Sequence, residues 1–217
     1  MPATAPPPLD LEPGPDGHVR CPWSTGSDLE RDYHDDEWGR PVVDDQRLYE
    51  KLCLEGFQSG LSWVTILRKR DHFRHAFAGF DPRVVARFDE TDVERLLGDA
   101  GIVRHRGKIE ATIANARATL DVQDRHGSLG ALVWSFEPDR ATATAPARPG
   151  DVPATTPEST ALARALRREG FRFVGPTTAY AAMQSLGLVN DHFADCWVRD
   201  ACTHDRAAAT VPVMPPA

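Results

Sequence analysis

The sequence has no long hydrophobic run. None of its 217 residues belongs to a stretch of about 18 apolar residues, the length that a membrane-spanning helix needs. The N-terminus also lacks the charged start and apolar stretch of a secretory signal and carries prolines instead. We therefore expect a cytoplasmic protein with no membrane partner, in which cysteines stay reduced.

Cysteine is scarce, and its four positions are Cys21, Cys53, Cys196 and Cys202. In a reducing compartment such residues are more often metal ligands or core thiols than disulfides. Cys53 lies in the apolar stripe of an expected helix, which favours a place in the core. The other three remain candidate metal ligands.

Basic residues are outnumbered. Lys and Arg total 25 against 32 Asp and Glu, which gives a net charge of −7, whereas nucleic-acid-binding domains are more often basic. The positive charge is gathered in three short runs, 68–75, 104–108 and 164–172. Any one run is typical of a solvated helix face, but together they favour a local basic face.

Alternating strand patterns and internal repeats are also missing. Apolar residues recur instead at helical spacing, most clearly at Ile109, Ile113, Ala116 and Leu120. Further helices are expected over 48–57, 62–70, 159–170 and 177–187, and Thr91 with Glu94 predicts a capping box for a helix that stops at Gly101. The predicted fold class is therefore all-α, in a single domain.

Composition sets the expected limits of this domain. The Pro-rich segment 1–19 and the tail 205–217 are predicted to be disordered, which leaves a folded domain over 20–204. Residues 141–157, "ATATAPARPGDVPATTP", are expected to form a long loop.

The stretch "NDHFADC" (190–196) contains two candidate metal ligands, His192 and Cys196. They stand four apart, so on a helix they would share a face. A structural zinc site nearly always needs four ligands, and Cys21 with His34 would complete a Cys2His2 set that joins the two ends of the domain. Cys202 and His204 remain rivals for any of these positions.

Several longer motifs carry a family resemblance. They are "RCPW", "DYHDDEWGRP", "LYEKLCLEGFQSGLSWVTILRKR", "LLGDAGIVRHRGKIEATIANAR", "VWSF" and "GFRFVGPTTAYAAMQSLGLVNDHFADC". In this order and spacing, over about residues 20–200, the chain resembles the DNA-3-methyladenine glycosylase I family. The resemblance implies an all-helical member of the helix–hairpin–helix glycosylase superfamily. It also implies excision of 3-methyladenine from alkylated double-stranded DNA in base-excision repair, and a structural Zn²⁺ on Cys21, His34, His192 and Cys196.

The resemblance also assigns a base pocket. Tyr33, Glu55 and Trp63 are expected to line it, with Trp23 and Trp38 alongside. Aromatic faces stack on a base and attract a cation, and Glu55 is the expected catalytic residue because its carboxylate would accept hydrogen bonds and offset the positive charge of the alkylated base.

DNA contacts are expected at two turns. By resemblance, the loop at Gly60 and Leu61 fills the gap left by a flipped nucleotide. "GFRFVGPTTAY" is expected to be the hairpin, in which Gly175 allows a tight turn and Thr177 or Thr178 caps the next helix. Free N–H groups at that helix start suit a DNA phosphate.

Alternatives remain for the chemistry. No lysine is expected in the pocket, so we predict water as the nucleophile and no lyase activity. Asp191 lies where related glycosylases carry a catalytic aspartate, but a structural role is favoured. Rival functions are a non-catalytic zinc-stabilised DNA-damage-binding module, and a catalytic zinc hydrolase that uses His34 with Asp35, Asp36 and Glu37. The protein is expected to be a monomer.

Overall fold

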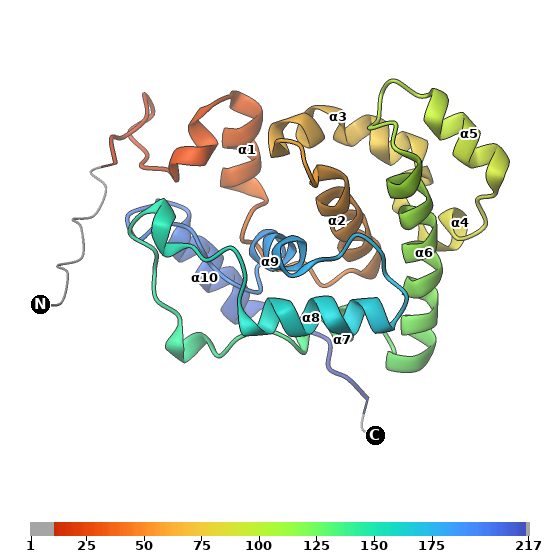
Figure 1. The fold of residues 1–217 in the computed structure, drawn as a ribbon. Helices are drawn as coiled ribbons and strands as arrows, with labels where there is room; N and C mark the ends of the chain where they lie inside the picture. Colours follow the sequence, from red (N-terminus) through yellow and green to blue (C-terminus); the bar gives the residue numbers. More distant parts are fainter. Residues whose placement is uncertain (1–10, 216–217) are drawn as a thin grey trace, which may run out of the picture.

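The computed structural model describes residues 11–215, and within that range it contains helices and connecting segments but no strand (Figure 1). The α-helices are α1 (Asp28–Asp36), α2 (Asp45–Gln58), α3 (Trp63–Ala76), α4 (Pro82–Val85), α5 (Glu90–Gly98), α6 (Arg106–His126), α7 (Leu129–Trp134), α8 (Pro157–Arg168), α9 (Pro176–Ser185) and α10 (Arg199–Ala208). Short 3-10 turns cover Pro22–Thr25, Ala78–Phe80, Arg140–Thr142 and Pro149–Asp151. The prediction of an all-α fold is confirmed.

Helix α2 lies at the centre of the molecule and contacts α3, α6, α7 and α9 (Figure 1). Its buried residues run around most of its circumference: Leu48, Tyr49, Leu52, Cys53, Leu54, Glu55, Gly56 and Phe57. A helix buried in this way is mostly apolar. Glu55 is the acidic exception, and Cys53 is a core thiol as predicted.

The apolar stripe predicted for 109–120 lies on α6, the longest helix. Ile109, Ile113 and Ala116 are buried against the core and Leu120 is half-buried. The predicted start of the helix around residue 91 is wrong. Asp89 is the N-cap of α5, its carboxylate accepts a hydrogen bond from the Thr91 N–H at 2.9 Å, and its capping-box partner is Asp92.

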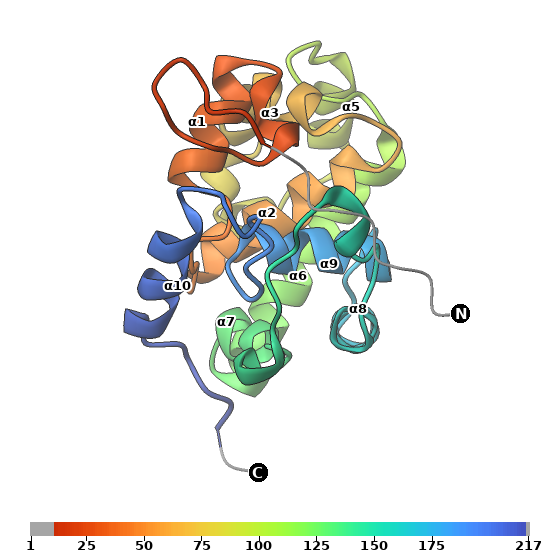
Figure 2. The same cartoon turned by 90° about the vertical axis from the view of Figure 1, so that its left-hand side faces the viewer.

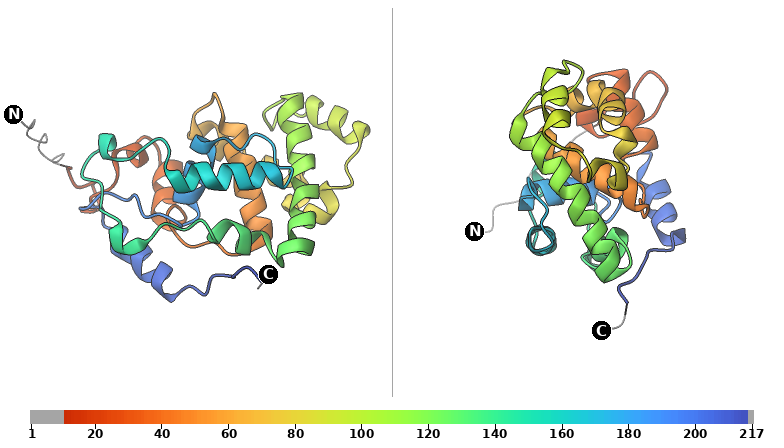
Figure 3. Two further views of the ribbon diagram at one scale, coloured as in Figure 1. Left: turned by 60° about the horizontal axis from the view of Figure 1, so that its bottom comes forward. Right: turned by 90° about the vertical axis from the view of Figure 1, so that its right-hand side faces the viewer.

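The segment between α8 and α9 is a tight hairpin, and the two contacting helices cross at a steep angle: α9 is seen end on in Figure 1, and α8 is seen end on in Figure 2 and in the right-hand view of Figure 3. The buried Asn115 amide on α6 clamps this hairpin, because it donates to the Arg172 carbonyl at 3.2 Å and accepts from the Arg172 N–H at 2.7 Å. Pro176 and Gly175 start α9, so Gly175 is its N-cap. Thr177 and Thr178 lie inside its first turn, and the prediction that one of them caps the helix is wrong.

The sequence predicts a folded domain over 20–204, and the structure bears on the C-terminal limit. Residues 1–10 of the predicted N-terminal extension lie outside the described residues. At the other end, the predicted boundary at 204 falls inside α10, where the buried Arg206 pairs with Glu137 at 2.7 Å and stacks over the Trp134 ring. Figure 2 shows α10 at the opposite end of the molecule from α5.

No described helix combines the length and apolar character needed to cross a membrane. Residues 141–157 form a loop that contains two 3-10 turns, as the composition predicts.

One half-buried contact predicts a measurable stability effect. The Asp45 carboxylate accepts hydrogen bonds from the Leu129 and Gly130 N–H groups at 2.9 and 2.8 Å and from Gln123 at 2.7 Å, so it joins α2 to the start of α7. Asp45→Asn should lower the free energy of unfolding by about 1.5–3 kcal/mol, measured by urea denaturation, because hydrogen bonds to a charged group are lost.

Asp28→Asn is the matched control. Asp28 pairs with Arg31 on the surface of α1, where removing one charge should change stability by less than about 1 kcal/mol. Equal effects of the two substitutions would contradict the role given to Asp45.

Candidate functional site

Four buried side chains meet beside α1. Cys21, His34, His192 and Cys196 each offer a ligand atom, and all four atoms lie within 4.8 Å of one another. His34 Nε2 lies 3.2 Å from His192 Nδ1 and 3.4 Å from Cys196 Sγ, and Cys21 Sγ lies 3.8 Å from His192 Nδ1. Metal bonds of about 2.0–2.3 Å in a tetrahedron separate neighbouring ligand atoms by about 3.3–3.8 Å. The set therefore fits a tetrahedral metal ion.

Second contacts hold the two imidazoles in this orientation. The outer nitrogen of His34, Nδ1, lies 2.8 Å from the Asp35 carboxylate, and the outer nitrogen of His192, Nε2, lies 3.0 Å from the Trp38 carbonyl. Metal-binding histidines commonly use their second nitrogen in this way. The ligating nitrogens are thereby left to face the cysteines.

The segment that supplies His192 and Cys196 is not helical. A turn brings them together, with the Cys196 N–H donating to the Phe193 carbonyl at 2.9 Å, and helix α10 starts only at Arg199. The rivals Cys202 and His204 are outside the four-residue cluster. The Cys202 thiol donates weakly to the Trp38 carbonyl, and the His204 side chain is 83% exposed.

A cavity of about 390 Å³ lies next to this cluster. Its wall includes all five residues predicted for the pocket, namely Trp23, Tyr33, Trp38, Glu55 and Trp63. Residues that the sequence did not single out as part of it are Pro22, Glu30, Gln58, Pro149, Val152, Ala181, Gln184 and Phe193. The volume is within the range of about 300–1,000 Å³ that is usual for small-molecule sites.

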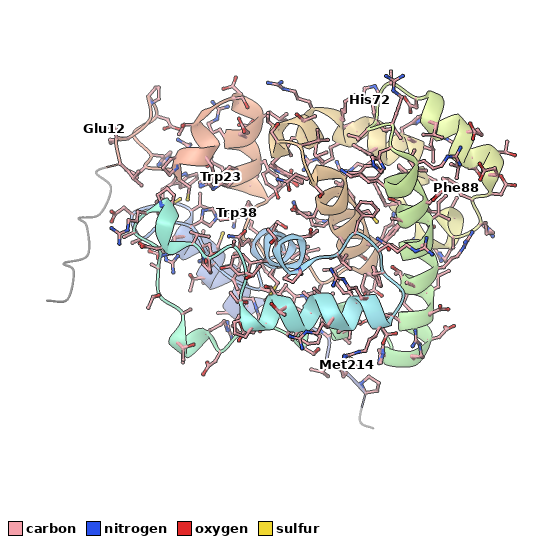
Figure 4. All side chains as sticks on the ribbon, in the orientation of Figure 1. Glu12, Trp23, Trp38, His72, Phe88 and Met214 are labelled. Atoms are coloured by element: carbon pink, nitrogen blue, oxygen red, sulfur yellow. The ribbon has the colours of Figure 1, made fainter. Side chains whose placement is uncertain are left out.

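The aromatic rings of the cavity wall contact one another and the Cys/His cluster. Trp23 and Trp38 meet edge to face with their ring centroids 5.1 Å apart, close together beside α1 (Figure 4). Trp38 lies 4.6 Å from the His192 ring, and Tyr33 lies 5.3 Å from Trp63. The Cys/His cluster and the cavity wall are thus one packed unit.

The only acid of α2 in this wall is paired with a lysine. Glu55 Oε1 lies 3.1 Å from Lys51 Nζ; the Glu55 side chain is buried, and the Lys51 side chain is 12% exposed. Burial raises the pKa of the Glu55 carboxyl, and the neighbouring Lys51 opposes that rise. Burial lowers the pKa of Lys51, against the effect of Glu55.

The expectation that no lysine lies in the pocket holds for the lining of the larger cavity, but it overlooked Lys51 directly behind the wall. Lys51 Nζ contacts Glu55, donates to the Tyr33 hydroxyl and lies 3.7 Å from the centre of the Trp63 ring. The i, i+4 spacing of Lys51 and Glu55 was the signal in the sequence, since residues four apart on a helix are neighbours.

Asp191 also lines the cavity, but its carboxylate has partners. It accepts hydrogen bonds from the Tyr180 hydroxyl at 2.6 Å and from the Gln184 amide at 2.8 Å, both on α9. These contacts fix the loop that leads to His192.

The two turns predicted to contact DNA lie on one side of α2. Gly60, with φ of 81°, and the exposed Leu61 connect α2 to α3, and Lys108 holds this turn by donating to the carbonyls of Phe57 and Ser59 at 2.9 and 2.6 Å. The exposed Phe173, with φ of 55°, is in the hairpin. It sits so close to α2 that a methyl group on Gly56 would lie 3.3 Å from its Cβ.

Two of the three basic runs meet at the hairpin. The run 104–108 leads into α6, and the ring centroids of its His105 and of Phe173 are 6.2 Å apart. Phe173 directly follows the run 164–172 in the hairpin. The run 68–75 lies on α3, where Arg70 pairs with Glu37 and Arg74 pairs with Glu50. The run 68–75 therefore contributes less free positive charge than its composition suggested.

Comparison with known proteins identifies the family. The family model described as methyladenine glycosylase matches residues 23–200. This chain belongs to the methyladenine glycosylase family. It is 48% identical over 177 residues to DNA-3-methyladenine glycosylase 1 of Escherichia coli (strain K12), a match that covers 82% of this chain and 95% of the relative.

Other members of the methyladenine glycosylase family agree. The DNA-3-methyladenine glycosylase of Haemophilus influenzae is 44% identical over 82% of this chain and 96% of its own length. A crystal structure of 3-methyladenine DNA glycosylase I superimposes with a TM-score of 0.79 at 49% identity, over 82% of this chain and 98% of that one. A variant of 3-methyladenine DNA glycosylase I in complex with 3-methyladenine gives a TM-score of 0.79 at 32% identity, over 83% and 97% of the two chains.

Proposed function

We propose that the protein excises 3-methyladenine from alkylated double-stranded DNA, as a glycosylase of base-excision repair that hydrolyses the N-glycosidic bond. The observation that carries this proposal is a base-sized cavity with five aromatic residues and one buried carboxylate, in a member of the methyladenine glycosylase family. A solved relative is described as a complex with 3-methyladenine, which supports the same ligand here.

The chemistry of the lesion suits this cavity. Methylation at N3 gives the adenine a positive charge, so the base already tends to leave. When the bond between the sugar C1′ and the base breaks, its electron pair goes to the base, which departs neutral. Water forms the new bond to C1′ and releases a proton. The protein must mainly extrude and hold the base.

Glu55 is the proposed catalytic residue because it is the buried acid that α2 brings to the cavity. Its carboxylate would accept hydrogen bonds from the base and offset its charge. The Trp63 Nε1–H is buried and has no hydrogen-bond partner among the described residues. A ligand acceptor would satisfy it, and an unsatisfied buried donor costs about 1–3 kcal/mol.

The rings of Tyr33, Trp23, Trp38 and Trp63 would stack on the extruded base. Aromatic stacking is worth about 1–3 kcal/mol per base and is insensitive to which base is stacked. Selectivity for the alkylated base then comes from its charge, which the aromatic faces and the Glu55 carboxylate favour.

DNA contacts are proposed at the two turns beside α2. Leu61, with Gly60, would occupy the gap in the duplex, as apolar side chains do at other unstacked steps. The first-turn N–H groups at Gly175, Thr177 and Thr178 would bind a backbone phosphate, since N–H groups at a helix start have no intrahelical partner. Such contacts carry no sequence information, which suits an enzyme that scans DNA.

The metal is proposed to be Zn²⁺, one per chain, held by Cys21, His34, His192 and Cys196. Two cysteines and two histidines in a closed tetrahedron are typical of structural zinc. All four positions would be filled by protein, so the ion would hold the cavity wall and take no part in the reaction.

The contacts of the nearby acids weigh against one rival function, the catalytic zinc hydrolase. A zinc hydrolase needs an open coordination position and free acids, but Asp35 contacts His34 and pairs with Arg20, and Glu37 pairs with Arg70. A non-catalytic damage-binding module would not release the base, so it is separated from the proposed enzyme by experiment. A monomeric state and a cytoplasmic location stay predictions from the sequence.

Base release tests the function directly. The protein should liberate 3-methyladenine from N-methylated duplex DNA, detected by chromatography of the released bases, and should leave the DNA strands uncut. Duplex that binds the protein without losing any base would instead support the damage-binding module.

Glu55→Gln tests the catalytic assignment. Loss of a hydrogen bond to a charged group, worth about 1.5–3 kcal/mol, should slow single-turnover base release by about 10- to 100-fold. Circular dichroism should show an unchanged helix content. A variant with the wild-type rate would remove Glu55 from the mechanism.

Zinc content tests the metal site. Cys196→Ser should lose the ion, by atomic absorption, and lower the thermal midpoint by more than about 10 °C, because structural metal binding contributes several kcal/mol to folding. Cys202→Ser is the control and should keep one zinc per chain. Loss of zinc from the control alone would assign the ligand to Cys202.

Asp191→Asn separates a structural carboxylate from a general base. It should weaken the bonds to Tyr180 and Gln184 and lower stability. The rate of base release should not fall by the factor of about 10²–10⁴ that removal of a general base or acid typically causes. A loss of that size in folded protein would make Asp191 catalytic.

A further inference from the structure

Behind the aromatic wall lies a second, smaller cavity of about 50 Å³. Tyr33 and Trp63 line both it and the larger cavity, so these two rings form the partition between them. Lys51 lines the smaller cavity and is not among the residues that line the larger one. Its charge therefore reaches the proposed base site from the rear of the wall.

The Lys51 ammonium is fully engaged by this wall. Its Nζ lies 3.1 Å from Glu55 Oε1 and 3.7 Å from the centre of the Trp63 ring. It also donates to the Tyr33 hydroxyl and lies 4.8 Å from the centre of the Tyr33 ring. These contacts favour the charged form of the amine, because aromatic faces and a carboxylate both attract a cation.

Glu55 is the acid that pairs with Lys51, because the other acids around the two cavities have other partners. On neighbouring elements, Glu37 pairs with Arg70 in two hydrogen bonds of 2.7 and 2.8 Å. Glu50, on α2, pairs with Arg74 at 2.8 Å. The remaining charged groups around the two cavities are the acids Glu30, held by Ser27, and Asp191, held by Tyr180 and Gln184, and the base Arg47.

We propose that Lys51 is a positioning residue: it keeps the Glu55 carboxylate ionised and braces the Tyr33 and Trp63 rings, so that the empty pocket is ready for a positively charged base. The inference rests on the proposed function, because it assigns a role in holding that substrate. Lys51 acts through Glu55 and the two rings, and its position behind them keeps its amine away from the sugar carbon that a Schiff base would need.

The direction of the effect follows from the buried pair. Burial raises the pKa of the Glu55 carboxyl, and the Lys51 charge lowers it. Removing the Lys51 charge leaves burial unopposed, so the Glu55 pKa rises further. Protonated Glu55 can no longer offset a cationic base, and activity should then fail at a pH where the wild type still works.

Lys51→Met tests this, because methionine keeps the apolar stem and removes the charge. The acid limb of the pH profile for 3-methyladenine release should move to higher pH by about one to three units, the effect of an opposite charge at this distance. Lys51→Arg should retain the wild-type limb. Lys69→Met, on α3, is the matched control and should leave the profile unchanged.

A lower rate with an unmoved limb in folded Lys51→Met would overturn the proposal and leave Lys51 a packing residue. If Lys51→Met does not fold, the double variant Lys51→Met/Glu55→Gln decides, because it removes both charges. Recovery of folding by the double variant supports the pairing, since an unpaired buried charge is strongly destabilising. A double variant that also fails to fold would overturn it.

A measurement without DNA keeps this inference separate from the enzyme activity. Titration of the ¹³C-labelled Glu55 carboxyl by NMR should give a higher pKa in Lys51→Met than in the wild type. If the wild type released no base, the proposed function would fail, and this titration would still test the pair. An equal Glu55 pKa in the two proteins would contradict the inference.

Discussion

The contact between the two ends of the domain is the constraint on which the site depends. Cys21 Sγ lies 3.8 Å from Nδ1 of His192, a residue 171 positions later in the chain. The segment that supplies Cys21 and His34 also carries Trp23, Tyr33 and Trp38, three of the rings that line the larger cavity. The buried Cys/His cluster therefore fixes the aromatic wall as well as the chain ends. A metal at this cluster would stabilise the wall without touching a ligand in the cavity.

The cavity wall has a charged side chain on each side: Glu55 lines the larger cavity and Lys51 lines the smaller one. Glu55 is buried on the central helix α2, where a carboxylate without a partner would be costly. Lys51, one turn earlier, supplies the partner, and the Tyr33 and Trp63 rings lie between the smaller cavity and the larger one. An acid that is needed for a cationic ligand can thus stay buried while the pocket is empty.

Apolar periodicity predicted most of the helices, and the family resemblance singled out the four Cys and His residues of the cluster and five of the residues that line the cavity. Periodicity was sufficient for the helices because apolar spacing fixes which face of each helix is buried. It failed where two polar groups competed for one role, as at the start of α5, where Asp89 rather than Thr91 caps the helix. It also missed Lys51, whose position depends on rings from α1 and α3 that approach only in the folded chain.

The late position of Cys196 has a consequence for protein synthesis. A ribosome adds residues from the N-terminus, and domains generally begin to fold as the chain emerges. Helix α2 with Glu55, and the rings of Tyr33 and Trp63, leave the ribosome well before His192 and Cys196, which lie more than 120 residues further along the chain. The cluster that ties down the wall can close only once these two residues have emerged. A truncated translation product that ends before residue 192 would therefore carry the pocket residues without the closure that holds them in place.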